Sequence, residues 1–423
     1  MSASPAVAAR PSLNAKRITT VSVTILFVAW IVNYVDRLAI TTALPSLAKE
    51  FGLDHTQQGL ILTVFFAIYA LFQLPGGLMA DRIGAKKTMI TAMVAWSLFT
   101  GLTGLVSSFG MLLIVRALFG VTEGLYPGAS MKAVAERTQP HNRMTANGIV
   151  TSANTLGAAL APLIAAPVIT AVGWRHTFFA VAGAGFLMAV VIWWALPAPL
   201  PEPTVAEGDG ERVLTTSATT DVSTAQLLRS GALWRFTLLF GGFDLVVWGL
   251  LSWVPSYLQT ERGVSITASG ALASIPNFCA TLSMIAGGVL FDRYFYGRHR
   301  LLIIPSCAIG GVLLLFMAYA TSTTTFITYQ SLAMLVLFLS FMPIFGLPLR
   351  MLPRNVVGRA SALINMGGQL AGAVAPFIMG LLADHVSFAA AFAFLIFGAV
   401  VAIAAVLWAP QRPEELRTDF AHA

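Results

Sequence analysis

The chain has 423 residues, of which 57% are hydrophobic and only 10% are charged, and its mean hydropathy is +0.79. Soluble domains carry about one-quarter charged residues, so this composition excludes an ordinary soluble protein and predicts an all-α integral membrane protein. The net charge of +7 comes from Lys and Arg spread in small groups over many loops. Such charges set membrane topology, so no nucleic-acid partner is expected.

Twelve segments are apolar and long enough to cross a bilayer, which takes about 20 residues each. In chain order they are 19–43, 58–80, 88–107, 110–132, 146–171, 176–197, 233–258, 267–291, 301–321, 325–350, 361–383 and 386–408. The residues before the first segment lack the short apolar core and the cleavage site of a secretory signal. The first segment is therefore expected to be retained as a transmembrane helix.

Lys and Arg residues divide unequally between the two sides of these spans. With the N-terminus inside, twenty lie on the cytoplasmic side and three lie outside, namely Lys49, Arg175 and Arg262. Positive charges are retained on the cytoplasmic side, so both termini are predicted to be cytoplasmic. The expected location is a plasma membrane, the inner membrane of a bacterium, crossed many times by a chain that functions as a monomer.

The cysteines and histidines do not indicate a metal or cofactor site. Cys279 and Cys307 fall within predicted spans, where a thiol behaves as a small apolar group. All six histidines lie in predicted loops, tails or helix ends. We therefore expect no disulfide framework, no metal, no cofactor and no histidine proton relay at the membrane centre.

A polar stretch separates the first six spans from the last six. It begins PAPLPEPTVAEGDGER after Leu196 and continues as a Ser/Thr-rich run, which is a linker composition. We predict an N-terminal six-helix bundle at 1–197, a cytoplasmic linker at 198–232, and a C-terminal six-helix bundle with a cytoplasmic tail at 233–423.

The two halves also repeat each other. GGLMADRIGAKK at 76–87 recurs as GGVLFDRYFYGRHR at 287–300, and APLIA at 161–165 recurs as APFIM at 375–379. Parallel repeats of this kind imply two bundles related by an axis along the membrane normal. The substrate site is then expected at the midplane between them.

The loop after the second span resembles the cytoplasmic loop motif of the major facilitator superfamily, G-x-x-x-D-R-x-G-x-K/R-K/R. The match begins at Gly77, and Asp81 and Arg82 are its D-R pair. The second copy keeps Asp292 and Arg293 and then departs from the pattern. The resemblance implies two six-helix bundles and a gating role for these five residues. Gly77 is also expected to let its helix approach a neighbour closely, and Asp81 to cap or pair with cations at facing helix ends. The alternative is an ordinary positive-inside loop without a gating role.

Three longer segments resemble the anion:cation symporter family, which includes sugar-acid carriers and vesicular and lysosomal organic-anion transporters. They are NYVDR at 33–37, YALFQLPGG at 69–77 and RALFGVTEGLYP at 116–127. The second half matches more loosely, through WVPSYL at 253–258 and NMGG at 365–368. In this family the acids carry the coupling proton and the arginine of the first helix contacts the anion, which implies these roles for Asp36, Glu123 and Arg37.

Two acidic and two basic residues stand in the first and fourth spans as two sets, Asp36 with Arg37 and Arg116 with Glu123. A charge at mid-membrane costs about 2.5–3.5 kcal/mol, so it is retained where it lines a protein-enclosed cavity and has a function. Arg116 and Glu123 are seven residues apart, which places them on nearly one helix face about 10 Å apart. The alternative is that the four residues form permanent ion pairs that join helices.

On the first span, Tyr34 and Arg37 share a face, while Asp36 points about 100° away toward other helices. Arginine stays charged and holds a carboxylate with two N–H groups, so Arg37 is the predicted substrate anchor. Asp36 and Glu123 are expected to bind and release protons as the site opens to each side.

Further polar side chains on the spans are candidates either for substrate contact or for bridging helices. These are Tyr34, Tyr69, Gln73, Asn154 and Asn365, together with Arg116. Position 154 carries Asn where some sugar-acid carriers have Gln, so a carboxylate is predicted more firmly than a polyhydroxylated chain. Asp244 on the seventh span has no counterpart in these motifs. It either lines the cavity or pairs with a polar group of a neighbouring helix. Trp248, on the same span, either walls the cavity or belongs to an interfacial belt.

These observations predict a secondary active transporter that carries a small organic anion together with protons by alternating access. The substrate is expected to be a sugar acid or another carboxylate. The alternatives are an aromatic-acid/proton symporter and a drug/proton antiporter, although the two core arginines argue against a cationic substrate. An enzyme is not expected, because the chain shows no nucleophile–base or metal-spacing motif and no soluble effector domain.

Overall fold

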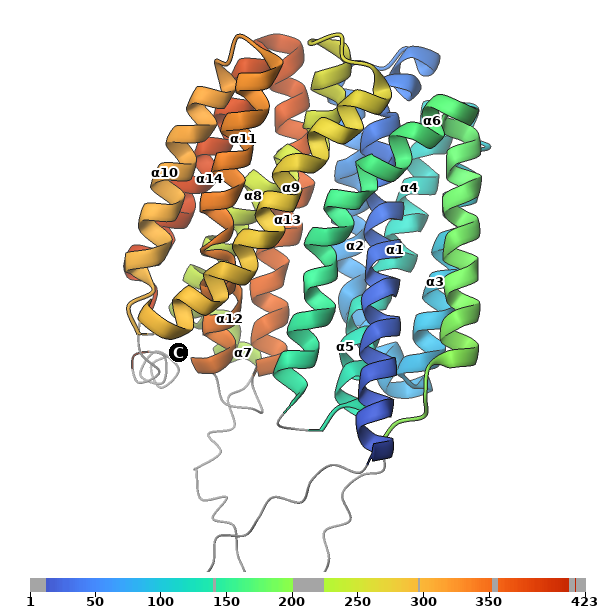
Figure 1. The fold of residues 1–423 in the computed structure, drawn as a ribbon, viewed down its shortest axis with the longest axis vertical. Helices are drawn as coiled ribbons and strands as arrows, with labels where there is room; N and C mark the ends of the chain where they lie inside the picture. The colour runs from blue at the N-terminus through green and yellow to red at the C-terminus, as the bar shows by residue number, and fades with distance from the viewer. Residues whose placement is uncertain are drawn as a thin grey trace, which may run out of the picture.

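The computed structural model describes residues 13–139, 142–200, 224–295, 297–351, 357–410 and 415. Within these ranges all regular structure is helical, and the helices stand side by side along one common direction (Figure 1). The all-α prediction is therefore confirmed for the described part of the chain.

The first half contains α1 (Leu13–Phe51), α2 (His55–Ile83), α3 (Ala85–Thr103), α4 (Phe109–Gly124), α5 (Tyr126–Arg137) and α6 (Arg143–Ala195). The fourth predicted span is divided at Leu125 into α4 and α5. Pro127 lies in the first turn of α5, where its missing N–H needs no partner. The fifth and sixth predicted spans run together as α6 and are separated by Gly173, whose φ of 81° breaks the helix.

The second half contains α7 (Thr224–Arg229), α8 (Gly231–Thr260), α9 (Ile266–Leu290), the π-helix η2 (Phe291–Phe295), α10 (Arg300–Ala318), α11 (Thr323–Phe338), α12 (Phe341–Met351), α13 (Val357–His385) and α14 (Phe388–Trp408). The tenth predicted span is thus divided between α11 and α12. Among the described residues, ten helices are long and apolar enough to cross a membrane. One of the ten, α6, contains two crossings because Gly173 breaks it, and α3, which is not among the ten, fills the third predicted span. The described spans therefore number twelve.

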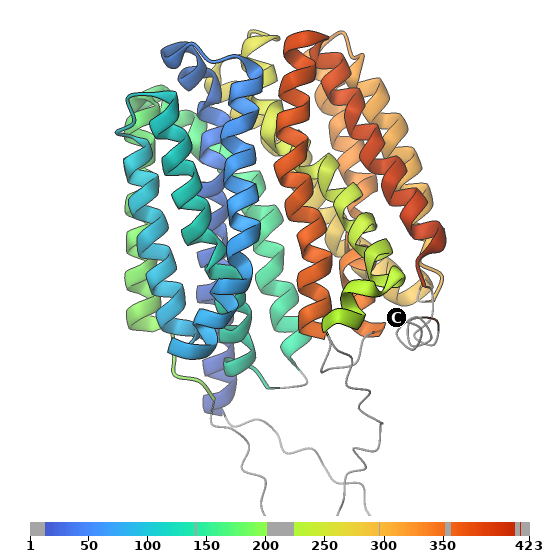
Figure 2. The ribbon, with the colours of Figure 1, turned by 180° about the vertical axis from the view of Figure 1, so that it is seen from behind.

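The helices form two groups, α1–α6 on one side and α8–α14 on the other (Figures 1 and 2). The groups meet where α2 packs against α13, α6 against α9, and α1 against α8. Residues 201–223 of the predicted linker lie outside the described residues, so the bundle boundaries at 197 and 233 stay a prediction.

Glycines allow the two groups to approach backbone to backbone. A Cβ atom on Gly59 of α2 would overlap the Pro376 carbonyl oxygen of α13, and one on Gly270 of α9 would overlap the Pro162 carbonyl oxygen of α6. Small residues at such crossings replace side-chain contact by backbone contact, which is how membrane helices associate closely. The interface between the groups is therefore tight at these crossings.

The two groups are also joined by hydrogen bonds at the end of the molecule where α1 finishes and α2 begins, the upper end in Figure 1. The carboxylate of Asp384, at the end of α13, accepts bonds from the backbone N–H groups of His55 and Thr56 at 3.0 and 2.7 Å. It also contacts His55 Nδ1 and accepts from the Thr56 hydroxyl, both at 2.6 Å. These are the first two N–H groups of α2, which have no partner within their own helix. An acid of the second half thus caps a helix of the first half.

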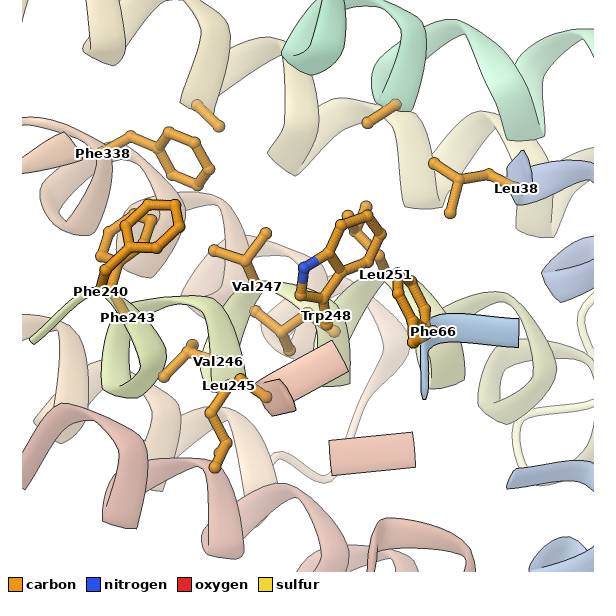
Figure 3. Close-up of a cluster of buried hydrophobic side chains, with 14 of the residues drawn as sticks. Leu38, Phe66, Phe240, Phe243, Leu245, Val246, Val247, Trp248, Leu251 and Phe338 are labelled. Atoms are coloured by element: carbon orange, nitrogen blue, oxygen red, sulfur yellow. The ribbon is translucent and has the colours of Figure 1, made fainter. Parts of the chain in front are cut away.

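The helix α8 lies deepest between its neighbours: 78% of its most apolar stretch is buried, against 28–50% for the other candidate spans among the described residues. Figure 3 shows its side chains Leu245, Val246, Val247, Trp248 and Leu251 within a buried apolar cluster. This central position places one face of α8 against the charged residues of the first half.

Candidate functional site

Arg37 of α1 and Glu123 of α4 form an ion pair that is fully enclosed, with side-chain exposures of 3% and 0%. The guanidinium Nε donates to Glu123 Oε2 at 2.9 Å, and Nη2 lies 2.8 Å from the same oxygen. Asn33, one turn before Arg37, donates through Nδ2 to the other carboxylate oxygen at 2.8 Å. Both oxygens of Glu123 therefore have donors, as a buried carboxylate requires.

Aromatic rings enclose the guanidinium of Arg37. Its Cζ lies within 6 Å of four ring centroids: Tyr69 at 4.5 Å, Tyr34 at 4.9 Å, Phe65 at 5.5 Å and Trp248 at 5.9 Å. Rings at this range attract a cation through their negative faces. Because Trp248 belongs to α8, the second half of the chain supplies one wall of a site whose charges come from the first half.

Asp36 faces away from this pair. The hydroxyl of Thr100 on α3 donates to both of its carboxylate oxygens, at 2.7 and 2.9 Å, and the residue is 0% exposed. None of the described cations lies within ion-pair distance of it. Asp36 is thus a buried acid whose contact is a neutral hydroxyl and not a cation.

Arg116 of α4 is also buried, with 1% exposure. Its Nη2 donates to the Thr103 hydroxyl at 2.7 Å, and its guanidinium packs 4.5 Å from the ring of Phe119 and 5.8 Å from that of Phe178. No ion pair joins it to Glu123 within the described residues. Arg116 therefore holds a buried charge without a carboxylate partner.

The two sets named from sequence order, Asp36 with Arg37 and Arg116 with Glu123, do not form ion pairs within themselves. Neighbours on a helix diverge by about 100°, and residues seven apart lie about 10 Å apart along the axis, so neither set is in contact. The packing of α1 against α4 instead pairs Arg37 with Glu123.

A small cavity of about 10 Å³, enough for about one water molecule, lies beside the two arginines. Its lining includes Arg37, Arg116 and Phe65 from the first half and Trp248 and Ser252 from α8, so the cavity lies between the two helix groups. A second cavity of about 10 Å³ shares the lining residues Leu38 and Thr41 with the first. The two fixed cations beside this space can attract a small anion once the helix groups separate and enlarge it.

The predicted amides Gln73 and Asn365 contact each other. Asn365 Nδ2 of α13 donates to Gln73 Oε1 of α2 at 2.9 Å, which joins the two helix groups. The ring of Tyr69, one turn before Gln73 on α2, lies 4.5 Å from the guanidinium of Arg37. Three of the predicted side chains therefore lie between the interface of the groups and Arg37.

Asn154 and Tyr34 lie where α1 packs against α6. A Cβ atom on Gly157, one turn after Asn154, would lie 2.6 Å from the Cβ of Tyr34. The Oδ1 atom of Asn154 is buried and has no hydrogen-bond partner among the described residues. It offers a free acceptor, which a hydroxyl of a ligand or a water molecule would satisfy.

Four of the predicted gating residues lie at helix ends: Asp81 and Arg82 in the last turn of α2, and Asp292 and Arg293 in η2, which follows α9. Both of these helix ends are on the lower side in Figure 1. Asp81 is exposed and pairs with Lys132 of α5 at 2.8 Å, and Lys132 also donates to the Ala80 carbonyl at 3.0 Å. Arg82 is exposed. The Asp81 pair lies within the first half, where it joins α2 to α5.

The expectation that Gly77 allows the close helix approach needs correction. A Cβ atom there would meet nothing within 4 Å, whereas one on Gly76 would lie 2.5 Å from the Leu125 Cα, and one on Gly128 would lie 3.0 Å from the Gly77 Cα. The contact of α2 with α4 and α5 therefore depends on Gly76 and Gly128. Sequence spacing did not distinguish two adjacent glycines, because the direction of approach depends on the neighbouring helix.

In the second copy of the motif, Asp292 and Arg293 are exposed and lie in the π-helix η2. The guanidinium of Arg293 lies 5.4 Å from the ring of Tyr294. The departure of this copy from the motif thus coincides with a departure from α-helical geometry.

Sequence reasoning missed the roles of Asn33, Thr100 and Thr103. Asn33 lies four residues before Arg37 and shares its face, a spacing that was available as a signal. The two threonines are three residues apart on α3 and contact Asp36 and Arg116. Nothing in an isolated span distinguishes such hydroxyls from those that bond their own helix, because the partner lies on another helix.

Comparisons with known proteins agree with this architecture. The model of the family described as Major Facilitator Superfamily matches residues 26–376. The hexuronate transporter of Bacillus subtilis (strain 168) is 29% identical over 369 residues, covering 85% of this chain and 87% of that protein. The probable L-galactonate transporter of Escherichia coli (strain K12) is 27% identical over 385 residues, covering 88% and 85%.

A crystal structure of a D-xylose-proton symporter superposes with a TM-score of 0.74 at 16% identity, covering 93% of this chain and 98% of that one. This likeness confirms the fold. The relatives named above are sugar-acid transporters, in agreement with the family resemblance of the sequence motifs. Since the family model covers most of its length, the chain belongs to the major facilitator superfamily and is a membrane transporter, not an enzyme.

Proposed function

We propose that this transporter is a proton-coupled symporter of a small organic anion, a sugar acid or another carboxylate, and that it works by alternating access. The observation that carries the proposal is the Arg37–Glu123 pair beside the central cavity. An arginine binds a carboxylate through its planar pair of donors, and here the position is occupied by a carboxylate of the protein itself. The hexuronate and L-galactonate transporters among the relatives support a sugar acid as the substrate.

The substrate carboxylate and Glu123 are then competitors for one guanidinium. A proton on Glu123 removes its charge and weakens its hold on Arg37, which leaves the guanidinium free for the incoming anion. Loss of that proton lets Glu123 return to Arg37 and displaces the anion. Binding of proton and binding of anion thereby favour each other, which is the requirement for symport.

Asp36 and Arg116 complete the charge arrangement. Arg116 interacts electrostatically with both Asp36 and Glu123, although it forms an ion pair with neither. Protonation of either acid leaves the cavity more positive and therefore more attractive to an anion. Asp36, held by the Thr100 hydroxyl, is the second candidate carrier of a coupling proton.

Alternating access requires the two helix groups to separate at one end while they close at the other. With both termini cytoplasmic, as the charge distribution predicts, the end closed by Asp384 faces outward. In this conformation the outer end is bridged by Asp384 and also by the hydroxyls of Thr170 and Thr267, which lie 3.0 Å apart. Opening to the outside must break these contacts.

Asp384→Ala is expected to favour the outward-open state, because it removes the acceptor of all four bonds to His55 and Thr56. A hydrogen bond to a charged group contributes about 1.5–3 kcal/mol, so losing even one shifts the two populations by at least about tenfold. Spin labels at the exposed positions Lys49 and Val386 report the separation of the outer ends by double electron–electron resonance. The share of long distances should rise.

The matched control for that experiment is Asp54→Ala. Asp54 caps the same end of α2 by accepting from Gln57 N at 2.7 Å, but it belongs to the first half and bridges nothing. Its loss should lower stability without changing the label distances. Equal distance distributions for the Asp384 variant and the wild type would contradict the proposed outer contact.

The transport activity itself is tested in proteoliposomes containing the purified protein. An inward proton gradient should drive accumulation of D-glucuronate or L-galactonate, and collapse of the gradient should abolish it. Benzoate tests the aromatic-acid alternative, which the four rings around Arg37 make worth testing, and a cationic drug tests the antiport alternative. Accumulation of benzoate alone, or export of the drug alone, would overturn the sugar-acid assignment.

A further inference from the structure

His55 is a histidine that the proposed proton and anion sites do not use. It is the first residue of α2, at the upper end in Figure 1, and its Nδ1 lies 2.6 Å from Asp384 Oδ1 at the end of α13. The two side chains keep 27% and 17% of their surface exposed, so water reaches both. A titratable group of the first half therefore meets an acid of the second half at the outer end of the molecule.

The second half surrounds His55 on several sides. The centroid of its ring lies 5.0 Å from that of Phe388 on α14 and 5.8 Å from that of Trp253 on α8. On α13, a Cβ atom on Gly380 would overlap the backbone oxygen of His55. The first residue of α2 is thus inserted among α8, α13 and α14, and it leaves this position only when the two helix groups separate.

The hydrogen bonds indicate the charge of the acid and the tautomer of the histidine. Oδ1 of Asp384 contacts the backbone N–H and the ring of His55, and Oδ2 accepts from the backbone N–H and the hydroxyl of Thr56. The ionised carboxylate is the form that only accepts, which suits four donors. Nδ1 of His55 then carries a hydrogen and donates it, and Nε2 is the nitrogen that takes up a further proton.

Asp384 is the ionisable group that contacts His55 among the described residues. Asp54, one residue earlier, is exposed and caps its own helix. His385, the neighbour of Asp384, is exposed as well. The faces of α8 and α14 that meet His55 present the two aromatic rings, which do not titrate in this way. The charge that responds to a proton on His55 is therefore that of Asp384.

We propose that His55 is a proton-binding residue of the outer contact, which holds the outer end closed more firmly when the outside is acidic. The inference rests on the proposed function, since it assumes that this contact opens during alternating access. A proton on Nε2 turns a bond between a neutral ring and a carboxylate into an ion pair, and charge-assisted hydrogen bonds are about twice as strong as neutral ones. Because the pair exists only while the outer end is closed, the proton favours closure and closure favours the proton.

The direction of the pH effect follows from the chemistry of histidine. Histidine changes its charge between about pH 5 and pH 8, so the share of outer-closed molecules should rise as the pH falls through this range. His55 stays accessible at the outer end in the described conformation, so its proton returns to the side from which it came. The residue is thus expected to change how fast the transporter reopens, and not how many protons accompany each anion.

Spin labels at Lys49 and Val386 measure this equilibrium in purified protein, without substrate and without a gradient. The core acids also respond to pH, so the comparison is made in a background that carries Asp36→Asn and Glu123→Gln. In this background the ratio of outer-closed to outer-open molecules should be about fivefold higher at pH 5 than at pH 8, as the gain from a charge-assisted bond implies. A ratio that does not change with pH would overturn the proposal.

Two substitutions of His55 separate the proton from the side chain. His55→Gln keeps an N–H donor for Asp384 but does not titrate, so its ratio should change by less than about 1.5-fold between the two pH values. His55→Lys keeps a positive charge at both, so its ratio should stay high at both. A pH response of the glutamine variant equal to that of its parent would show that another group is the sensor, and the proposal would be wrong.

The matched control is His176→Gln. His176 is also exposed at the outer end, but its Nδ1 contacts the Val172 carbonyl at 2.9 Å, within the first half. It bridges nothing, so this variant should keep the full pH response. Loss of the response in His176→Gln would show that the labels report a general effect of surface charge, which would also contradict the role of His55.

Transport gives an independent readout in proteoliposomes with the same pH on both sides. Counterflow of a sugar acid is compared between His55→Gln and the wild type, both with their core acids intact. The ratio of the two rates should rise by about threefold from pH 8 to pH 5, because only the wild type reopens more slowly in acid. A constant ratio would overturn the proposal. If the wild type transports none of the acids, the proposed function fails, and the label distances alone decide whether His55 senses the proton.

Discussion

Glu123→Gln is expected to bind the anion and exchange it across a membrane, but to lose accumulation driven by a pH gradient. Glutamine resembles the protonated acid in shape and charge, so Arg37 is permanently available to the substrate. Counterflow of labelled sugar acid should stay within about threefold of the wild type. Uptake against a concentration gradient should fall to the level measured without a proton gradient, because the carried proton has lost its site.

The same substitution should change stability in a way that reports on the pair. In the variant without substrate, Arg37 has lost its ionised partner. Breaking a buried ion pair lowers the free energy of unfolding by about 3–5 kcal/mol. The glutamine oxygen still accepts a hydrogen bond and recovers part of this loss. A bound carboxylate replaces the missing charge. The rise in melting temperature on adding substrate should therefore be larger in Glu123→Gln than in the wild type.

Glu50→Gln is the matched control, since Glu50 also pairs with an arginine, Arg175, but lies at the outer end of α1, away from the cavity. It should keep gradient-driven uptake. Asp36→Asn should lose coupling as Glu123→Gln does. If both core variants still concentrate substrate in response to an imposed pH gradient, these acids are structural and the coupling site lies elsewhere.

Arg37→Lys is expected to weaken anion binding by more than tenfold, which corresponds to about 1.4 kcal/mol or more. Lysine keeps the charge but loses the planar pair of donors that holds a carboxylate. It also loses the guanidinium plane that packs among the rings of Tyr34, Tyr69, Phe65 and Trp248. Equilibrium binding to the purified protein measures the effect.

The control for this substitution is Arg175→Lys. Arg175 forms an ion pair with Glu50 and lies 4.3 Å from the ring of Trp174. Like Arg37 it therefore has a carboxylate and an aromatic ring as neighbours, but it does not line the cavity. Its affinity for the anion should stay within about twofold of the wild type. Wild-type affinity in Arg37→Lys would show that the substrate is anchored elsewhere, with Arg116 the remaining cation of the cavity.

Much of the fold was predictable because a bilayer permits few solutions. Backbone groups in lipid must bond within their own helix, so twelve apolar stretches had to become twelve spans. The breaks inside these spans were harder to predict. Gly173 is recognisable as the turn within α6, but the division of the fourth span at Leu125 and of the tenth span before Phe341 depends on how each helix packs against its neighbours.

The candidate site was predictable as a set of residues and not as a set of contacts. Charges inside apolar spans are costly, so Asp36, Arg37, Arg116 and Glu123 were identifiable without any coordinates. Which of them touch is a property of two helices together. The structure pairs Arg37 with Glu123 and leaves Asp36 to the Thr100 hydroxyl, and neither contact follows from spacing along one chain segment.

The sequence by itself therefore determined the membrane class, the number of spans and the residues that carry charge, because composition, length and the cost of burying a charge act on each segment separately. Only the tertiary structure decided the partners: Glu123 for Arg37, Thr100 for Asp36, and Asp384 for the first turn of α2. Each of these contacts joins groups whose distance is set by the packing of whole helices or by the rotation of a side chain within that packing. A one-dimensional pattern contains neither quantity.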